Sequence, residues 1–418
     1  MENKKLKIGL FGFGVVGEGL YRVLAQTPSL EASIVKCCIR QANKKRNAPA
    51  DLFTTDANEL LNNPEINTIV EVIDDAEAAF HIVTTALRNG KAVVSASKKM
   101  IAEHLPELLS LQQETGLSFL YEAAACASIP VVRNLEEYYD NDLLHAIKAI
   151  VNGSTNFILT KMFEEQIGFP EALLQAQQLG FAESNPTLDV NGLDAVNKWS
   201  ILLNHAYGIV AHPRRILFTG IQNIQGSDAA VAKEKGFDIK LVAQAKKLKN
   251  GKVAAFVLPQ WIGAQEPLRF VRNEYNGVVI ESGFADQQFF YGKGAGSFPT
   301  ASAVLSDLSA LRYQYKYEYK KLYRHQPHTL SQDYYLRVYL SFSDWKNISR
   351  ESFEWIEEWH AQAERKYLVG VLHVSHLLHE DWWQENGTSL VLTPDPIIDD
   401  LDLVQVKKKS LELAGIAD

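Results

Sequence analysis

The chain has 418 residues, of which 46% are apolar and 22% are charged, proportions that are ordinary for a globular protein. Its length exceeds one average domain, so we expect two or three. The net charge of −8 argues against general nucleic-acid binding, and no apolar run reaches the ~18 residues of a membrane-spanning helix. Only three cysteines occur, Cys37, Cys38 and Cys126, without paired zinc spacing, which favours a reducing, cytoplasmic setting.

The amino terminus predicts a dinucleotide-binding turn. The strand-like run Leu6–Phe11 is followed by GFGVVG at residues 12–17 and then by a helical stretch. In this context, the first glycine would allow a tight turn, the second would let a pyrophosphate approach, and the third would let helix and strand pack closely. A glycine-rich loop of another α/β domain is the alternative. The expected cofactor contacts are Gly12, Gly14, Val15, Val16 and Gly17.

The second expected strand, Ser33–Ile39, should end beside the adenosine ribose of a bound cofactor. Sites that prefer NAD place an acid there, whereas this chain has Arg40, followed by Lys44, Lys45 and Arg46. Cations at that place would pair with a 2′-phosphate. We therefore predict NADP(H) in preference to NAD(H), with a solvated basic loop as the alternative.

Strands and helices then alternate along the chain. The helical pattern of Glu77–Arg88 is flanked by apolar runs typical of strands, which are Thr68–Ile73, Lys91–Ser95, Leu117–Tyr121 and Ala146–Val151. This alternation predicts an α/β fold with a parallel sheet.

Lys98 lies just after the strand that ends at Ser95. Ligands of open α/β sheets bind outside the carboxyl ends of the strands, so Lys98 is placed to meet substrate or cofactor. Lys99 is an equal candidate on spacing alone, and a plain surface lysine is the ordinary alternative for both.

The segment Gly180–Lys198, GFAESNPTLDVNGLDAVNK, concentrates polar groups before an apolar helical run. Asp194 and Lys198 are four residues apart and would share one helix face. Such a pair is usually a surface ion pair, but carboxylates and a lysine on a packed face are more typical of a polar site. Gly208 is the expected end of this helix.

Taken together, these segments resemble the homoserine dehydrogenase family, from about Lys7 to about Leu308. The resemblance implies an amino-terminal Rossmann domain for NAD(P), residues 1–130, completed by about 297–325. It also implies an α+β substrate-binding and dimerisation domain at 131–296. The matching segments are GLFGFGVVGEGL, VVSASKKMIA, YEAAACASIPVV, AIVNGSTNFIL, GFAESNPTLDVNGLDAVNK, GFDIKLVAQA and GKGAGSFPTASAVLSDL.

By this resemblance the chain interconverts homoserine and aspartate 4-semialdehyde, as a homodimer or higher homo-oligomer. Lys198 is implied as the acid/base, and Lys98 as a cation that stabilises negative charge on the reacting oxygen. Glu183 and Asp194 are implied to hold the α-ammonium of the substrate. Further implied contacts are Asp189, Gly153 and Ser154 for substrate, and Ser95, Gly294 and Gly296 for cofactor.

The resemblance also implies a monovalent cation, Na⁺, held by backbone carbonyls. The matching positions are Glu122, Ala125, Ala127 and Ile129. Elsewhere the chain departs from the family, because Asp74 and Asp75 replace a common glycine pair. Acids there can cap the following helix.

The region after about His325 is the least informative. Strands are expected at Tyr334–Phe342, Tyr367–Val374 and Ser389–Thr393, and a helix at Arg350–Glu364. This order resembles the ACT-type regulatory domain of some family members, although FSDWKNIS replaces its glycine-rich turn. We expect a small α+β domain at 326–418 that adds structure or an oligomer contact; binding of a regulatory amino acid is the alternative. Five of the seven tryptophans lie here, at interfaces or in a core.

Two other functions stay open on the sequence alone. One is another amino-acid or semialdehyde oxidoreductase on the same scaffold. The other is a non-catalytic regulator that binds NADP. The set Glu183, Asp194, Lys198 and Lys98 argues against the regulator, because a non-enzyme does not need it.

Overall fold

The structure is a computed structural model that describes residues 5–141, 143–362 and 365–413. Contacts within the chain define two compact units. Unit 1 comprises Met1–Asp140, Asn197–Pro213 and Gly292–His325, and unit 2 comprises Asn141–Val196, Arg214–Tyr291 and Gln326–Asp418. No helix among the described residues is long and apolar enough to cross a membrane.

Unit 1 is built on a six-stranded parallel sheet with the order β3-β2-β1-β4-β5-β6. The five apolar runs that predict β1, β2, β4, β5 and β6 are confirmed, whereas the two-residue β3 has no counterpart among the predicted strands. The strands are β1 (Leu6–Phe11), β2 (Ala32–Cys38), β3 (Phe53–Thr54), β4 (Thr68–Glu71), β5 (Ala92–Ser95) and β6 (Phe119–Leu120).

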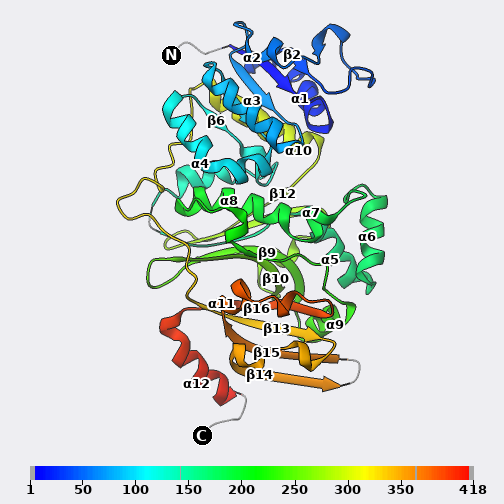
Figure 1. The fold of residues 1–418 in the computed structure, drawn as a ribbon, viewed down its shortest axis with the longest axis vertical. Helices are drawn as coiled ribbons and strands as arrows, with labels where there is room; N and C mark the ends of the chain where they lie inside the picture. Colours follow the sequence, from blue (N-terminus) through cyan, green and yellow to red (C-terminus); the bar gives the residue numbers. More distant parts are fainter. Residues whose placement is uncertain (1–4, 142, 363–364, 414–418) are drawn as a thin grey trace. The chain divides into compact units, whose positions relative to one another are not determined.

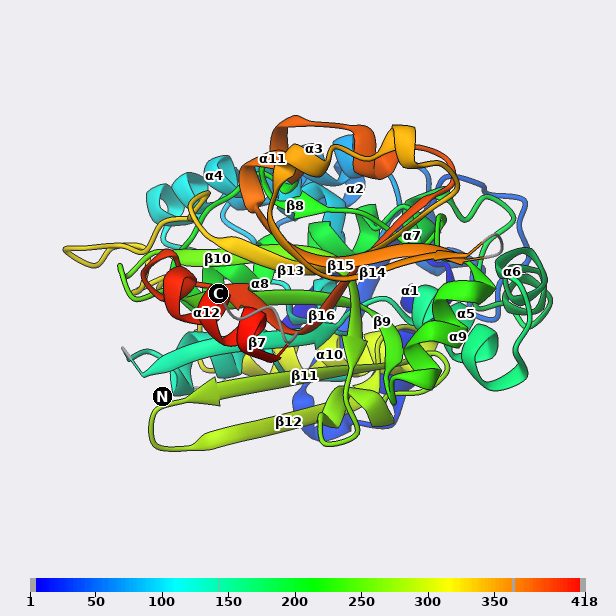
Figure 2. The same cartoon turned by 90° about the horizontal axis from the view of Figure 1, so that it is seen from below.

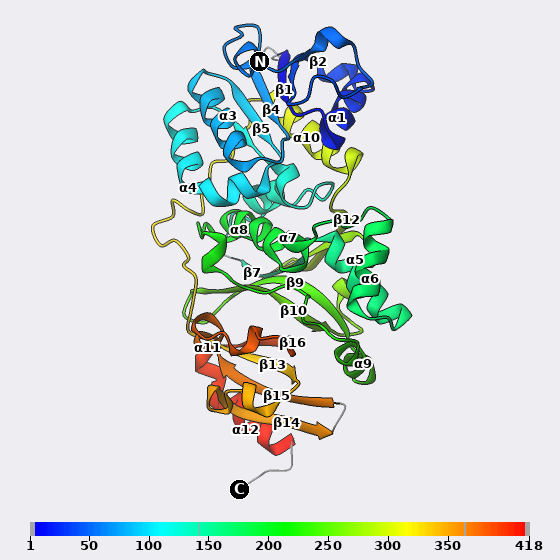
Figure 3. The ribbon, with the colours of Figure 1, turned by 45° about the vertical axis from the view of Figure 1, so that its right-hand side comes forward.

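Helices cover both faces of this sheet. Figures 1 and 3 show α3 (Ala76–Arg88) and α4 (Lys98–Thr115) on one face, with α1 (Val15–Ala25) and α10 (Ser297–Leu311) on the other. The short α2 (Asn58–Leu61) precedes β4. The helix α10 comes from late in the chain and packs against α1, so the chain returns to this unit.

Unit 2 contains a mixed sheet with the order β12-β11-β7-β9-β10-β16-β13-β15-β14, and β8 pairs with β10 (Figure 2). The strand expected at Ala146–Val151 exists as β7, but its place in the parallel sheet is wrong, because β7 pairs antiparallel with β9 and β11. The strands are β7 (Leu144–Ile150), β8 (Leu217–Phe218), β9 (Asp238–Lys247), β10 (Val253–Ile262), β11 (Tyr275–Ser282), β12 (Asp286–Lys293), β13 (Tyr335–Phe342), β14 (Phe353–Gln362), β15 (Arg365–His373) and β16 (Thr388–Ile398).

One long helix, α8 (Leu193–Tyr207), begins in unit 2 and continues into unit 1. It ends where the sequence predicts, because Gly208 has φ +70°, a left-handed conformation that favours glycine. The other helices of unit 2 are α5 (Gly153–Glu165), α6 (Phe169–Gln178), α7 (Thr187–Val190), α9 (Gly226–Glu234), α11 (Val374–His379) and α12 (Leu403–Leu413).

The helix expected at Arg350–Glu364 is wrong. A 3₁₀ turn at Arg350–Ser352 leads directly into β14, and the last two residues of the expected helix lie outside the described residues. Trp355 and Trp359 are four apart, which imitates helical spacing. Instead, they pair across strands with Val371 and Leu368 of β15, as aromatic side chains do on a pleated surface.

The four strands of the tail lie in the order β16-β13-β15-β14, which is fourth-first-third-second in the chain. This is the order of a split βαββαβ unit. Here two 3₁₀ turns replace its first helix, and FSDWKNIS forms the first of them at Trp345–Asn347. Trp355 and Trp383 are buried in the tail, so packing within the chain accounts for these two tryptophans.

Candidate active site

The turn between β1 and α1 has the geometry that a pyrophosphate requires. Gly12 has φ +96°, and a Cβ there would lie 2.9 Å from the carbonyl oxygen of Val72. A Cβ on Gly17 would lie only 2.1 Å from the oxygen of Gly12, so the helix could not pack as closely. Gly14 is exposed at the amino end of α1 and faces open space. These residues therefore fit a phosphate group approaching the helix terminus.

The second glycine-rich segment adjoins this turn. Gly296 has φ +114° and precedes α10, while Gly294 is buried. The hydroxyl of Ser297 donates a 2.7 Å hydrogen bond to the carbonyl oxygen of Val15. Within unit 1, both glycine-rich segments thus meet at the start of α1.

One cavity, of about 480 Å³, lies in unit 2, and another, of about 430 Å³, lies in unit 1 at the end of β2. Lys44 and Arg46 line the latter, together with Phe53. Arg46 donates hydrogen bonds to the carbonyl oxygens of Lys44 (2.7 Å) and Gln41 (2.8 Å), and its guanidinium lies 5.4 Å from the Phe53 ring centre. Arg40 is exposed two residues after β2.

Ser95 ends β5 with its hydroxyl turned inward. Its Oγ donates to Oε2 of Glu71 (2.5 Å) and accepts from the backbone N–H of Ser97 (3.1 Å). Burial raises the pKa of Glu71 to about 7, with hydrogen bonds from Ser95 and Ile73 opposing the shift and the charge of Asp74 adding to it. The Ser95 hydroxyl is therefore committed to the interior of unit 1.

Burial separates the two lysines that the sequence leaves equal. Lys98 is the first residue of α4 and is half-buried, whereas Lys99 is exposed, with its Nζ 3.9 Å from Glu103. A cation at the positive end of a helix is electrostatically unfavourable, which is typical of a functional position. Asp75 caps α3 by accepting a hydrogen bond from the N–H of Ala78, so this departure from the family has a local structural role.

On α8, Asp194 and Lys198 are one helical turn apart, with relative exposures of only 6% and 7%. Trp199, beside Lys198, is fully buried. A solvated surface ion pair would be far more exposed, and buried charges persist in proteins only when they are paired or hydrogen-bonded. This first turn of α8 is therefore a polar position inside the molecule.

Asn152, which the sequence reasoning missed, joins two of the predicted carboxylates. Its Nδ2 donates to Oδ1 of Asp189 (2.7 Å) and to Oδ2 of Asp194 (2.8 Å). Its Oδ1 accepts from the N–H of Thr155 (2.8 Å) and so caps α5. The available signal was the run NGSTN, in which an asparagine precedes a helix.

The neighbouring predicted residues have different surroundings. Ser154 donates a 2.6 Å hydrogen bond to the carbonyl oxygen of Phe181, and a Cβ on Gly153 would lie 2.5 Å from the oxygen of Glu274. Glu183 is exposed in the turn after α6. Unit 2 thus directly links Asn152, Asp189 and Asp194, whereas the carboxylate of Glu183 faces solvent.

The segment with the predicted cation ligands is tightly folded. Glu122 is buried, and its carboxylate accepts from the N–H groups of Val132 (2.8 Å) and Arg133 (3.0 Å). Its own N–H donates to Asp307, whose pKa is raised well above the ordinary value by burial and by the charge of Glu122. Ala127 has φ +44°, which turns the chain sharply between Ala125 and Ile129.

Comparison with known proteins identifies the family of this chain. Residues 12–122 match the NAD-binding domain model of homoserine dehydrogenase, and residues 130–309 match the homoserine dehydrogenase model. The chain belongs to the homoserine dehydrogenase family. It is 35% identical to the Bacillus subtilis homoserine dehydrogenase over 74% of this chain and 73% of that one. It is 37% identical to the Synechocystis homoserine dehydrogenase over 72% of each.

Solved structures agree with these relatives. The Thiobacillus denitrificans homoserine dehydrogenase superposes with a TM-score of 0.79 at 26% identity, over 94% of this chain and 99% of that one. A hyperthermophilic archaeal homoserine dehydrogenase mutant in complex with NADPH has a TM-score of 0.64 at 27% identity, over 75% and 100%. The chain is accordingly an NAD(P)-dependent oxidoreductase with homoserine dehydrogenase activity, and it contains the predicted parallel nucleotide-binding sheet and a mixed-sheet catalytic part.

Proposed function

We propose that the enzyme interconverts L-homoserine and L-aspartate 4-semialdehyde with Lys198 as the acid/base and NADP(H) as the preferred cofactor. The observation that carries the proposal is the buried first turn of α8, where Asp194 and Lys198 share one helix face. A lysine four residues from the substrate-holding carboxylate can reach an oxygen on the same bound molecule.

Asp194 binds the α-ammonium of the substrate in this proposal, with Glu183 as a second carboxylate. Asn152 keeps Asp189 and Asp194 together by donating one N–H to each. Each of the two neighbouring carboxylates therefore accepts a hydrogen bond from the same amide, which stabilises both in one site. Gly153 and Ser154 fix the start of α5, which carries Asn152 as its cap. These residues orient the substrate before the reaction.

Proton and hydride transfer are divided between protein and cofactor. The nicotinamide supplies the hydride chemistry when bound. Lys198 accepts the proton of the substrate hydroxyl as the aldehyde forms and returns it in the reverse direction. Lys98, at the carboxyl edge of the nucleotide-binding sheet, stabilises negative charge on the reacting oxygen.

Substitution of the lysines tests these roles. Lys198→Ala should lower kcat by about 10²-fold or more, the contribution typical of a general acid–base, while NADPH still binds. Lys99→Ala is the matched control, because Lys99 is exposed and should leave kcat unchanged. Stopped-flow reduction of NADP with homoserine, together with an NADPH binding titration, measures both. Normal kcat in the Lys198 variant would refute the acid/base role.

The cofactor preference rests on Arg40 and on the basic cavity at the end of β2. Lys44 and Arg46 line that cavity, and no carboxylate is among its lining residues within the described chain. A 2′-phosphate would be paired there, and an unphosphorylated ribose would gain less. We expect kcat/KM to be higher with NADP than with NAD by about tenfold or more, since one charge-assisted contact contributes ~1.5–3 kcal/mol. An Arg40→Ala/Arg46→Ala variant should narrow this ratio, and an NAD preference in the unmodified enzyme would sink the proposal.

The remaining expectations are proposals of the same kind. Supported by family membership, we place the enzyme in the cytoplasm as a homodimer or higher homo-oligomer, with Na⁺ on the carbonyl oxygens of Glu122, Ala125, Ala127 and Ile129. We also propose three functional segments: 1–130 with 297–325 for cofactor, 131–296 for substrate, and 326–418 as a carboxyl-terminal domain. Sedimentation and kinetics in Na⁺ against tetramethylammonium buffers test the assembly and the cation.

A further inference from the structure

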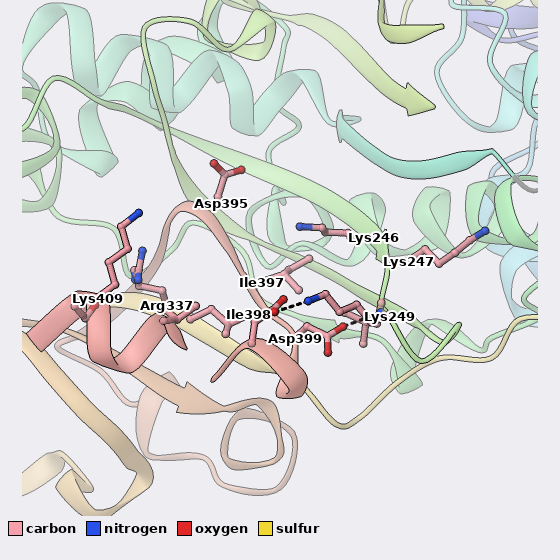
Figure 4. Close-up of a pocket in the computed structure, with 13 residues that line it drawn as sticks. Lys246, Lys247, Lys249, Arg337, Asp395, Ile397, Ile398, Asp399 and Lys409 are labelled. Atoms are coloured by element: carbon pink, nitrogen blue, oxygen red, sulfur yellow. Dashed lines mark hydrogen bonds and ion pairs between the residues drawn. The ribbon is translucent and has the colours of Figure 1, made fainter. Parts of the chain in front are cut away.

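A second cavity, of about 480 Å³, lies entirely within unit 2, at the end of the β9–β10 hairpin. Its walls come from β9, β13, β16 and α12, so it joins the hairpin of the substrate-binding segment to the tail (Figure 4). No residue of the nucleotide-binding turn or of α8 lines it. This volume is within the ~300–1,000 Å³ range of small-molecule sites.

Contacts between distant segments hold the walls in place. The N–H of Lys249, in the hairpin turn, donates to Oδ2 of Asp399 (2.8 Å). On the opposite side, Ser410 of α12 donates to Oε1 of Glu357 (2.5 Å), and Val406 packs against the cluster of Trp355, Val371 and Ile398. The walls of the cavity are thus formed by secondary-structure elements that hydrogen bonds and apolar packing hold to one another.

Three aspartates line this cavity, Asp395, Asp399 and Asp402, and each has a partner. Asp395 is exposed, and one of its oxygens lies 3.8 Å from Lys148. Asp399 accepts from the N–H groups of Lys249 and Leu401, and Asp402 forms an ion pair with Lys249. The Nε of Arg337 lies 3.2 Å from Glu357. These carboxylates are therefore occupied with local cations and donors.

Two of the basic groups have no such partner. Within the described part of the chain, neither Lys246 nor Lys409 lies within 4 Å of a carboxylate. Figure 4 shows the Lys246 ammonium directed from one side toward the space that Arg337 and Lys409 border from the other, while Lys247 points away. The whole chain has a net charge of −8, so the positive charge of Lys246 and Lys409 at this cavity is a local feature and not a property of the whole surface.

We propose that this cavity binds a small phosphate-bearing ligand, with Lys246, Arg337 and Lys409 on the phosphate groups. The planar guanidinium can present two parallel N–H donors to phosphate oxygens, and the lysines act as point charges. Ile397 and Ile398 line the wall beside them and provide an apolar surface for an uncharged part of the ligand. A ligand held there would contact both the β9–β10 hairpin and the tail.

The test is calorimetric titration of the full-length chain with inorganic pyrophosphate at low and moderate salt. The Lys246→Gln/Lys409→Gln variant should bind at least about tenfold more weakly, since charge-assisted contacts are lost. The matched control is Lys252→Gln/Lys408→Gln, which removes the same charge from the same hairpin and helix but from side chains that do not line the cavity. Binding at the nucleotide turn is common to both variants and cancels in the comparison.

Hydrogen exchange locates the effect. Pyrophosphate should slow exchange in 246–252 and 399–410 of the unmodified chain, and not in the Lys246→Gln/Lys409→Gln variant. Homoserine oxidation should be unchanged in both variants, which confirms that they are folded. Absence of binding, equal weakening in the two variants, or protection elsewhere only would overturn the proposal, because each outcome means that the cavity is not a specific phosphate site.

Discussion

Glu71 is a buried acid at the carboxyl end of β4 in the nucleotide-binding sheet. It is fully buried, and its raised pKa of about 7 means that the folded chain holds a proton that the unfolded chain releases near pH 4.5. Between these values the folded state binds more protons, so stability falls as pH rises, by at most ~1.4 kcal/mol per pH unit. Above about pH 7 the loss is complete. The charge of Asp74 adds to the upward shift of this pKa.

We therefore expect Glu71→Gln to become more stable relative to the unmodified chain between pH 5 and pH 8. The reason is that a neutral amide does not release the proton. Urea midpoints at pH 5, 6.5 and 8 measure the effect. Glu114→Gln on the exposed side of α4 is the control, and it should follow the unmodified chain. Parallel curves for Glu71→Gln and the unmodified chain would show that Glu71 does not titrate in this range.

At the scale of elements, α8 carries the proposed acid/base Lys198 and is anchored two turns beyond it. His205 lies seven residues after Lys198, on the same face of the helix. Its Nδ1 is 2.8 Å from Glu136 and its Nε2 is 2.9 Å from the Tyr121 hydroxyl, all within unit 1. Glu136 also accepts from the N–H of Tyr319 (2.7 Å). This buried network fixes the position of α8 against three other segments of the unit.

Breaking the network should affect both stability and rate. Burial raises the pKa of Glu136, but hydrogen bonds and charge from His205, with help from Lys321, outweigh this and lower the net pKa. The contribution is therefore present at neutral pH and lost as pH falls through the carboxylate range. Glu136→Gln should cost ~3–5 kcal/mol at pH 7, the range for breaking a buried pair, and should lower kcat. Urea unfolding at pH 7 and pH 4, with turnover at pH 7, measures this.

The neighbouring Glu137 provides the control for this prediction. Its carboxylate is exposed and accepts a hydrogen bond from the Tyr315 hydroxyl (2.8 Å), so Glu137→Gln should be nearly neutral. If the network around Glu136 positions α8 for catalysis, Glu136→Gln should have a lower kcat with little change in the affinity for NADPH. Equal effects of the two substitutions would contradict it.

The elements also show what a sequence can and cannot predict. Strands β1, β4 and β5 and the start of α8 follow from apolar runs, glycine and helical spacing, which are local signals. The sheet to which β7 belongs depends on pairing with β9 and β11, more than ninety residues away in register (Ala146 with Lys246), and no local pattern encodes it. The spacing of Trp355 and Trp359, four residues apart, fits both a helix and a strand, so it does not distinguish β14 from the helix expected there.

The same distinction holds for the candidate site. Lys198, Asp194 and Lys98 could be selected because their residue types are unusual beside a packed helix or at a strand end. Asn152 could not be selected in the same way, because its importance lies in reaching Asp189 and Asp194, 37 and 42 residues later. Its role as a cap of α5 alone would have explained an asparagine there.

At the scale of the whole molecule, the tail of 326–418 shares a hydrophobic core with the segment before it. Phe256 and Leu258 of β10 are fully buried in one cluster with Leu336, Val338 and Leu340 of β13. In the sheet, β16 joins β10 directly, through the pair Gln260 and Leu392.

A chain truncated after His325 should therefore fail to fold as a soluble unit. Each fully buried large apolar side chain contributes ~1.5–3 kcal/mol, so exposing several of them removes an amount comparable to a net stability of ~5–15 kcal/mol. We expect loss of a cooperative thermal transition, strong binding of a hydrophobic dye, and no homoserine oxidation. A chain ending after Asp402 is the matched control, since the apolar side chains that α12 packs on the sheet among the described residues, Leu403 and Val406, are only partly buried, and loss of α12 should be tolerated. If the chain that ends after His325 stays folded and active, the tail is an appended module, and its shared core with β10 contributes little to stability.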